Sequence, residues 1–169
     1  MNFKKITMLA FTLCVTLMAS TAAFAQRTGQ ITANPGTLTV AQDVEVKIEM
    51  FEDKNCTKPI PNGANLSYSG GAPAAFVRFT LRNNVGVKTD SFTFKRVIER
   101  DGVKVFDPAA SQLSLNAHEV KVFPAEMVYF SGTSNTVEAR ILADIGNFIK
   151  ETNETNNSAK YTVKASVVH

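Results

Sequence analysis

The feature that most constrains this chain is an alternation of apolar and polar residues that recurs from residue 26 onward. A period of two places successive side chains on opposite faces of an extended strand. The alternation is clearest at residues 44–50, 76–82, 92–98, 137–143 and 161–167. No stretch longer than two turns shows the three-and-four spacing of an amphipathic helix. The pattern therefore predicts an all-β chain built from half-buried strands.

Turn-forming residues separate these stretches. Asp101-Gly102 lies between two alternating runs and tolerates the positive φ angles of a tight primed turn, which predicts a β-hairpin. About seven short strands with such turns between them predict an antiparallel β-sandwich. The longest interruption, Glu52 to Pro73, is rich in Pro, Gly, Asn and Ser. It exceeds ordinary loop lengths, so it is either a boundary before the main domain or a surface loop within it.

The N-terminus has the three parts of a secretory signal peptide. Two lysines, Lys4 and Lys5, precede an apolar run from Ile6 to Met18, and the stretch ends in Ala23-Phe24-Ala25. The run is too short for a spanning helix. We expect export with cleavage before Gln26, to the periplasm or the medium. The predicted organisation is a signal peptide at 1–25, N-terminal strands and the Pro/Gly/Asn-rich loop at 26–73, and the main β-sandwich at 74–169.

Cleavage changes the charge and cysteine counts. The whole chain carries 18 basic and 15 acidic side chains, and loss of Lys4 and Lys5 leaves 16 against 15. A nearly neutral chain gives no reason to expect a nucleic acid partner. The sequence after residue 25 has no apolar run long enough to predict a membrane span. Cys56 is then the one remaining cysteine. It is reactive between lysines, paired with a cysteine of another chain, or an unpaired thiol without a role, and the absence of a resolving cysteine favours the last of these.

The most distinctive segment joins the last two alternating stretches, from Asp144 to Asn157. It resembles the corner between the final two strands of the bacterial cell-adhesion-related domain family (CARDB). The matching residues, in order, are Asp144, Asn147, Ile149, Glu151, Asn153, Glu154, Asn156 and Asn157. The run from Phe76 to Gly86 resembles that family's second strand and its following turn. The resemblance covers about residues 74–168 and implies an immunoglobulin-like sandwich with a binding or structural role.

Two interpretations of this corner stay open. Asn and Asp side chains cap backbone groups and tolerate left-handed conformations, and Ile149 can plug the end of the sandwich, so the corner can be purely structural. Calcium takes six to eight hard oxygen ligands. The candidate calcium ligands are Asp144, Glu151, Asn153 and Asn156. The structural interpretation is favoured because Asn-rich turns are common, and we expect no cofactor apart from this candidate ion.

Catalytic motifs are not apparent in the sequence. His118 is the one internal histidine, so neither a nucleophile–base pair nor a three-ligand zinc set can be assembled from recognised patterns. We therefore expect a non-enzymatic, exported binding or adhesion-type module with a protein or cell-surface partner. The alternatives are a small periplasmic enzyme or inhibitor with an unrecognised carboxylate site, and a structural accessory of an envelope assembly. The sequence leaves the partner and the oligomeric state open.

Overall fold

A computed structural model describes residues 41–69, 73–130 and 134–168. They all belong to one compact unit, residues 40–169. The predicted signal peptide at 1–25 lies outside the described residues. Within the described ranges the chain forms strands, turns and bends without an α-helix, and so contains no helix that could cross a membrane.

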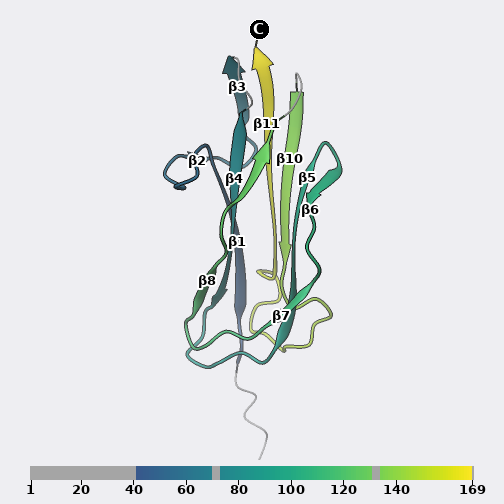
Figure 1. Ribbon diagram of the computed structural model, residues 1–169. Helices are drawn as coiled ribbons and strands as arrows, with labels where there is room; N and C mark the ends of the chain where they lie inside the picture. The colour runs from purple at the N-terminus through teal and green to yellow at the C-terminus, as the bar shows by residue number, and fades with distance from the viewer. Residues whose placement is uncertain (1–40, 70–72, 131–133, 169) are drawn as a thin grey trace, which may run out of the picture. The chain divides into compact units, whose positions relative to one another are not determined.

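The first sheet has five strands (Figure 1). Its path runs β2 (Pro59–Ile60), β1 (Val44–Phe51), β4 (Ala74–Asn83) and β8 (Val120–Val122), and β9 (Glu126–Tyr129) also pairs with β4. All pairings are antiparallel. The central contact is the eight-residue ladder between β1 and β4, in which Val44 lies opposite Asn83 and Phe51 opposite Phe76.

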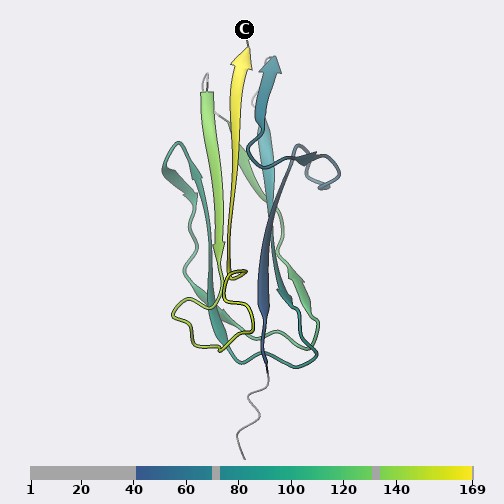
Figure 2. The ribbon, with the colours of Figure 1, turned by 180° about the vertical axis from the view of Figure 1, so that it is seen from behind.

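The second sheet has six strands. Its path runs β3 (Asn65–Ser69), β11 (Ser158–Val168), β10 (Ser134–Leu142), β5 (Phe92–Arg100) and β6 (Val103–Phe106), and β7 (Ser111–Leu113) also pairs with β5. The β3–β11 pairing is parallel and the others are antiparallel. In both views β10 and β11 run side by side along the sheet (Figures 1 and 2).

Apolar side chains from both sheets form one core between them. The alternation on β4 buries Val77, Phe79 and Leu81 completely, as the sequence predicts. Across the core lie Ile98, Val137 and Ile141 of the six-stranded sheet, also fully buried. Each fully buried aliphatic or aromatic side chain contributes about 1.5–3 kcal/mol of transfer free energy. The predicted all-β sandwich is confirmed. The described residues form eleven strands rather than about seven, three of them only two or three residues long, and the parallel β3–β11 pairing departs from the predicted antiparallel arrangement.

Arg96 is the exception on the inner face of β5. Its guanidinium carbon lies 4.2 Å from the ring centroid of Phe123 and 5.3 Å from that of Phe106. Burial lowers the pKa of this guanidinium. The Arg96 side chain therefore covers the core on the side of the sandwich where β6 and β8 are the edge strands of the two sheets.

The structure answers two questions about local geometry. Asp101 and Gly102 have φ angles of 52° and 78°, so the predicted hairpin joins β5 to β6. The Glu52–Pro73 segment contributes β2 and β3 to the two sheets. The described part of this segment therefore lies within the sandwich. The strands before residue 74 also share the core of the sandwich, since Val44 and Met50 of β1 are fully buried.

Candidate functional site

A groove of about 390 Å³ runs over the outer face of the five-stranded sheet. We call it the β4 groove, because Arg78, Thr80 and Arg82 of that strand form its floor. Strands β1 and β8 form its two walls. The wall residues are Glu45, Lys47 and Glu49 on β1 and Val120 and Val122 on β8. On β1 and β4, the alternation that buries one face places these side chains on the other face. All three residues of β8 are exposed, and its two valines line the groove.

One end of the groove is fixed by a compact set of contacts. Arg78 Nε and Nη2 both donate to Glu49 Oε2, at 3.2 and 2.8 Å, and Lys47 Nζ donates to Glu49 Oε1 at 2.9 Å. The Lys47 bond is the main cause that holds the pKa of Glu49 below its usual range, and the Arg78 bonds add to it against the opposing effect of burial. The Arg78 guanidinium also covers Phe51, at 4.6 Å from the ring centroid. Phe51 is consequently only 4% exposed although it lies on the outer face.

The other end of the groove has unpaired charges beside exposed valines. Glu45, Arg82 and Val120 lie in one transverse row, because Arg82 is the register partner of both other residues. In the described part of the chain, neither Glu45 nor Arg82 forms an ion pair within 4 Å. Val120 and Val122 are each 52% exposed. This end combines an available guanidinium with apolar surface, the composition that is typical of binding sites at protein interfaces.

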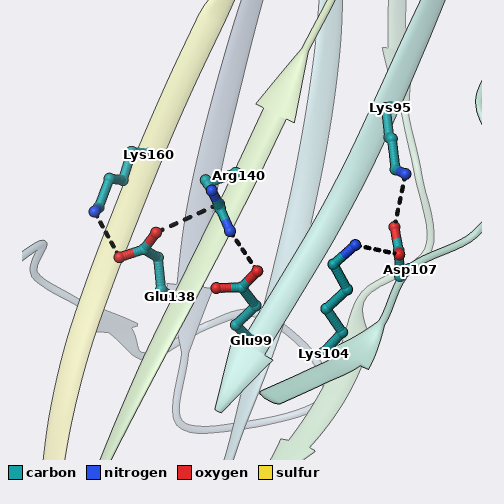
Figure 3. A network of polar contacts seen from close by, with 7 residues as sticks. All are labelled: Lys95, Glu99, Lys104, Asp107, Glu138, Arg140 and Lys160. Atoms are coloured by element: carbon teal, nitrogen blue, oxygen red, sulfur yellow. Dashed lines mark hydrogen bonds and ion pairs between the residues drawn. The ribbon is translucent and has the colours of Figure 1, made fainter. Parts of the chain in front are cut away.

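The outer face of the six-stranded sheet is different (Figure 3). Glu138 of β10 accepts from Lys160 of β11 at 2.6 Å and lies 3.4 Å from Arg140, whose guanidinium also pairs with Glu99 of β5. A second cluster places Lys104 and Lys95 at 2.7 and 3.0 Å from Asp107, and these two lysines, Lys104 first, lower its pKa. The charges on this face are largely satisfied within the molecule.

The predicted site residue Asp144 serves the backbone of its own corner. Its side chain is 5% exposed, and its two carboxylate oxygens accept from the N–H groups of Phe148 and Ile149, each at 3.0 Å. Asp144 and Asn147 have φ angles of 45° and 54°, in the left-handed region that these residue types tolerate. These contacts direct Ile149 into the core, where it is 1% exposed.

Glu151 links the corner to the edge of the five-stranded sheet. Its Oε2 accepts from the Val44 N–H at 3.1 Å and from the Asn157 amide nitrogen at 2.9 Å, in the orientation that lets this amide also donate to the Val44 carbonyl. Burial raises the pKa of Glu151 to about 7, and Glu154 and Asp144 add to the effect. Both views place this corner at the end of the sandwich where β1 begins (Figures 1 and 2).

The four candidate calcium ligands have separate roles in the structure. Asn153 Oδ1 accepts from the N–H and hydroxyl of Thr155, and Asn156 Nδ2 donates to Asp43 at 2.9 Å. Glu151 Oε1 and Asn156 Oδ1 are the two oxygens of the set that are buried without a hydrogen-bond partner. Among the described residues, no group of three or more His, Cys, Asp or Glu side chains is arranged to hold a metal ion. The donors therefore fit an ion poorly, and calcium binding remains a prediction for experiment.

Cys56 lies in the turn between β1 and β2, far along the chain from the corner. It is half-buried with a φ of 56°, and its N–H donates to Asp53 O at 3.0 Å. The Asp53 carboxylate also accepts from the N–H groups of Thr57 and Lys58. Cys56 is a free thiol, in a turn that is held by Asp53 rather than by the sulfur. His118 occupies another turn, with a φ of 56°.

Sequence reasoning did not single out the β4 groove. The signal was present, since polar or charged residues occupy alternate positions in both residues 45–49 and 78–82. Alternation shows which side chains share a face of one strand. It does not show that β1 and β8 lie on either side of β4, because these strands are far apart in sequence.

Neither a protein-family model nor a curated protein matches the sequence. Two solved structures of the CARDB domain of the PF1109 protein from Pyrococcus furiosus are similar to this chain. The crystal structure, in complex with di-metal ions, has a TM-score of 0.49 at 18% identity, and the solution NMR structure has a TM-score of 0.45 at 19% identity. Each comparison covers 76% of this chain and 96% of that domain.

Proposed function

We propose that this chain is an exported, non-enzymatic protein-binding module of the adhesion type, and that the β4 groove is its contact surface. The observation that carries the proposal is the open end of the groove, where Arg82 forms no ion pair with any described residue and lies beside the exposed valines of β8. A guanidinium next to desolvatable apolar surface is a common anchor for a protein partner. The predicted signal peptide supports export, and CARDB resemblance supports a binding role by analogy.

The rigid side of the groove supports the same function. Arg78 is held by Glu49 and by stacking on Phe51, so it needs no reordering when a partner arrives. Preorganised side chains lose less conformational entropy on binding, which leaves more of the contact energy for affinity. The groove can therefore present one fixed and one available guanidinium, of Arg78 and Arg82, along a single strand.

Site-specific photo-crosslinking tests the proposal. A photoreactive residue replaces Thr80 at the centre of the groove, and a matched protein carries it at Leu142, which is 43% exposed on the other sheet. We expect capture of a discrete envelope or surface protein from position 80 and not from position 142. The captured protein is then purified and its affinity measured. Equal capture from both positions, or from neither, contradicts the proposed contact surface.

A further inference from the structure

The backbone of β8 is an open edge of the five-stranded sheet. Asn83 N–H donates to Glu119 O at 2.9 Å, and Phe123 N–H donates to Phe79 O at 3.0 Å. Residues 119 and 123 thus turn their backbone groups toward β4. Because the direction alternates along an antiparallel strand, Val120 and Val122 turn their N–H and C=O groups the other way. No described strand pairs with β8 on that side.

Other edge positions of the same sheet are covered by the chain itself. On the β1 side, Val44 N–H is bound by Glu151 Oε2 and Val46 N–H donates to Asn156 O. On the β9 side, Tyr129 O accepts from Arg100 Nη1 at 2.9 Å. Folded proteins usually cover or charge their sheet edges because an open edge pairs with other chains. The Val120–Val122 edge differs from these positions, since it combines outward backbone groups with exposed valine side chains.

The charged side chains around β8 determine which kind of peptide segment can pair with this strand. Arg82 lies in register with Val120 and has no ion pair within the described ranges, and the exposed Lys121 lies between the two valines in the sequence. Glu119, at the start of β8, is engaged by the backbone and side-chain nitrogens of Asn116. Glu45, the other unpaired charge of this row, lies on β1, on the far side of β4 from β8. The available side chains next to the edge itself are therefore the positive ones. They favour a segment with carboxylates, and the valines favour aliphatic residues on the same face.

We infer that β8 receives an extended acidic–aliphatic segment of a partner protein by strand addition, an inference that rests on the proposed function. The segment pairs its backbone with Val120 and Val122. One of its carboxylates reaches Arg82, and an aliphatic side chain two positions away packs on the valines, since residues two apart share a face. Lys121 and the following Pro124 limit the pairing to a short stretch, which makes the interaction reversible.

Selection from a display library of random decapeptides tests this chemistry on the purified protein. We expect enrichment of peptides with an acidic residue two positions from an aliphatic one. Binding of a synthetic representative should slow hydrogen exchange of the Val120 and Val122 amides about fivefold or more, as expected for newly bonded strand amides. Backbone N-methylation of the same peptide should abolish binding, because it removes the donors that strand addition requires.

Matched variants test the role of Arg82. Arg82→Gln should weaken the acidic peptide about fivefold or more and leave its glutamine counterpart unchanged, since a charge-assisted bond is lost. Lys88→Gln, at an exposed lysine that does not line the β4 groove, should leave both affinities unchanged. Enrichment of basic peptides, protection at amides outside β8, or full binding of the N-methylated peptide would overturn the inference. So would sedimentation as a dimer that protects the same amides, which would assign the edge to a second copy.

The two proposals fail separately. If crosslinking at Thr80 captures a partner while peptides neither enrich nor protect β8, the groove binds proteins but strand addition is wrong. If crosslinking captures nothing and peptides also fail, both proposals are wrong.

Discussion

The outer faces of the two sheets use charge in different ways. On the six-stranded sheet, Glu138 lies between Lys160 and Arg140, and Asp107 between Lys95 and Lys104 (Figure 3). On the five-stranded sheet, Glu49 pairs with Lys47 and Arg78, but Glu45 and Arg82 form no ion pair with the residues that the structure describes, and Arg82 lies next to exposed valines. Both faces come from the same period-two pattern. The difference teaches that the alternation along a strand defines which side chains lie on the outer face. The register between strands decides whether the charged side chains on that face form ion pairs or stay available.

The comparison of the two outer faces requires an intact sandwich, and the corner at residues 144–157 holds its two sheets together. Asp144→Ala should disrupt this corner and have the largest effect. The variant loses two bonds to backbone N–H groups, leaves them buried, and places alanine at a φ of 45°. We expect the free energy of unfolding to fall by about 2–4 kcal/mol, measured by urea denaturation. Asp144→Asn keeps an acceptor and tolerates the backbone angle, so it should lose about half as much. Equal, small losses in both variants would show that this carboxylate does not hold the corner.

The pH dependence of stability should report the link between Glu151 and β1. The pKa of Glu151 is about 7 in the folded protein and 4.5 as its ordinary value. The folded state thus binds more protons between these values, and stability falls as the pH rises from about 4.5 to 7. Allowing for solvent screening, we expect a loss of about 1–2 kcal/mol, or roughly 5 °C in Tm.

Glu151→Gln provides the control for this titration. It removes the ionisable group, so this part of the pH dependence should disappear while the groove and the ion pairs of the other sheet remain. Thermal unfolding of both proteins at pH 5 and pH 8 is the measurement. Parallel pH profiles for the two proteins would contradict the assignment to Glu151.

A smaller effect distinguishes the two faces directly. Glu138→Gln removes the acceptor that serves both Lys160 and Arg140, whereas Glu45→Gln removes a carboxylate that pairs with no cation in the described part of the chain. We expect Glu138→Gln to cost about 0.5 kcal/mol at low ionic strength and less at high salt, and Glu45→Gln to cost almost nothing. Urea denaturation at two salt concentrations measures both. A larger cost for Glu45→Gln would reverse the comparison.

The smallest expected effect concerns calcium. Both Asp144 oxygens are used by backbone N–H groups, and Asn153 Oδ1 is used by Thr155. We therefore expect no change in Tm when millimolar Ca²⁺ is added, because an ion without affinity adds no stability by mass action. A rise in Tm that is abolished by a chelator would instead identify the corner as a calcium site.

Local sequence features predicted much of the fold. Alternation identified the inward faces of β1, β4, β10 and β11, and the positive φ angles of Asp101-Gly102 confirm the hairpin that this dipeptide predicted. The burial of Ile149 confirms its predicted place at the end of the sandwich. These features depend on residues within a few positions of each other, where propensity and turn chemistry act.

Long-range contacts could not be predicted in the same way. The parallel pairing of β3 with β11 joins residues about 100 positions apart, so the Glu52–Pro73 segment gave no local sign of its place in a sheet. Glu151 was marked by its type as an ion ligand, but its carboxylate binds Val44, a residue 107 positions away. The β4 groove likewise depends on the register of Arg82 with Val120. Single-sequence patterns carry no register between distant strands.

The most direct test of the central claim compares one substitution on each face. Arg82→Gln and Arg140→Gln remove the same charge from the five-stranded and six-stranded sheets, and the affinity of the captured partner is measured for both purified proteins. We predict a loss of about tenfold for Arg82→Gln, near the free energy of one charge-assisted hydrogen bond, and no significant change for Arg140→Gln. Unchanged affinity for Arg82→Gln together with a loss for Arg140→Gln would place the binding face on the other sheet.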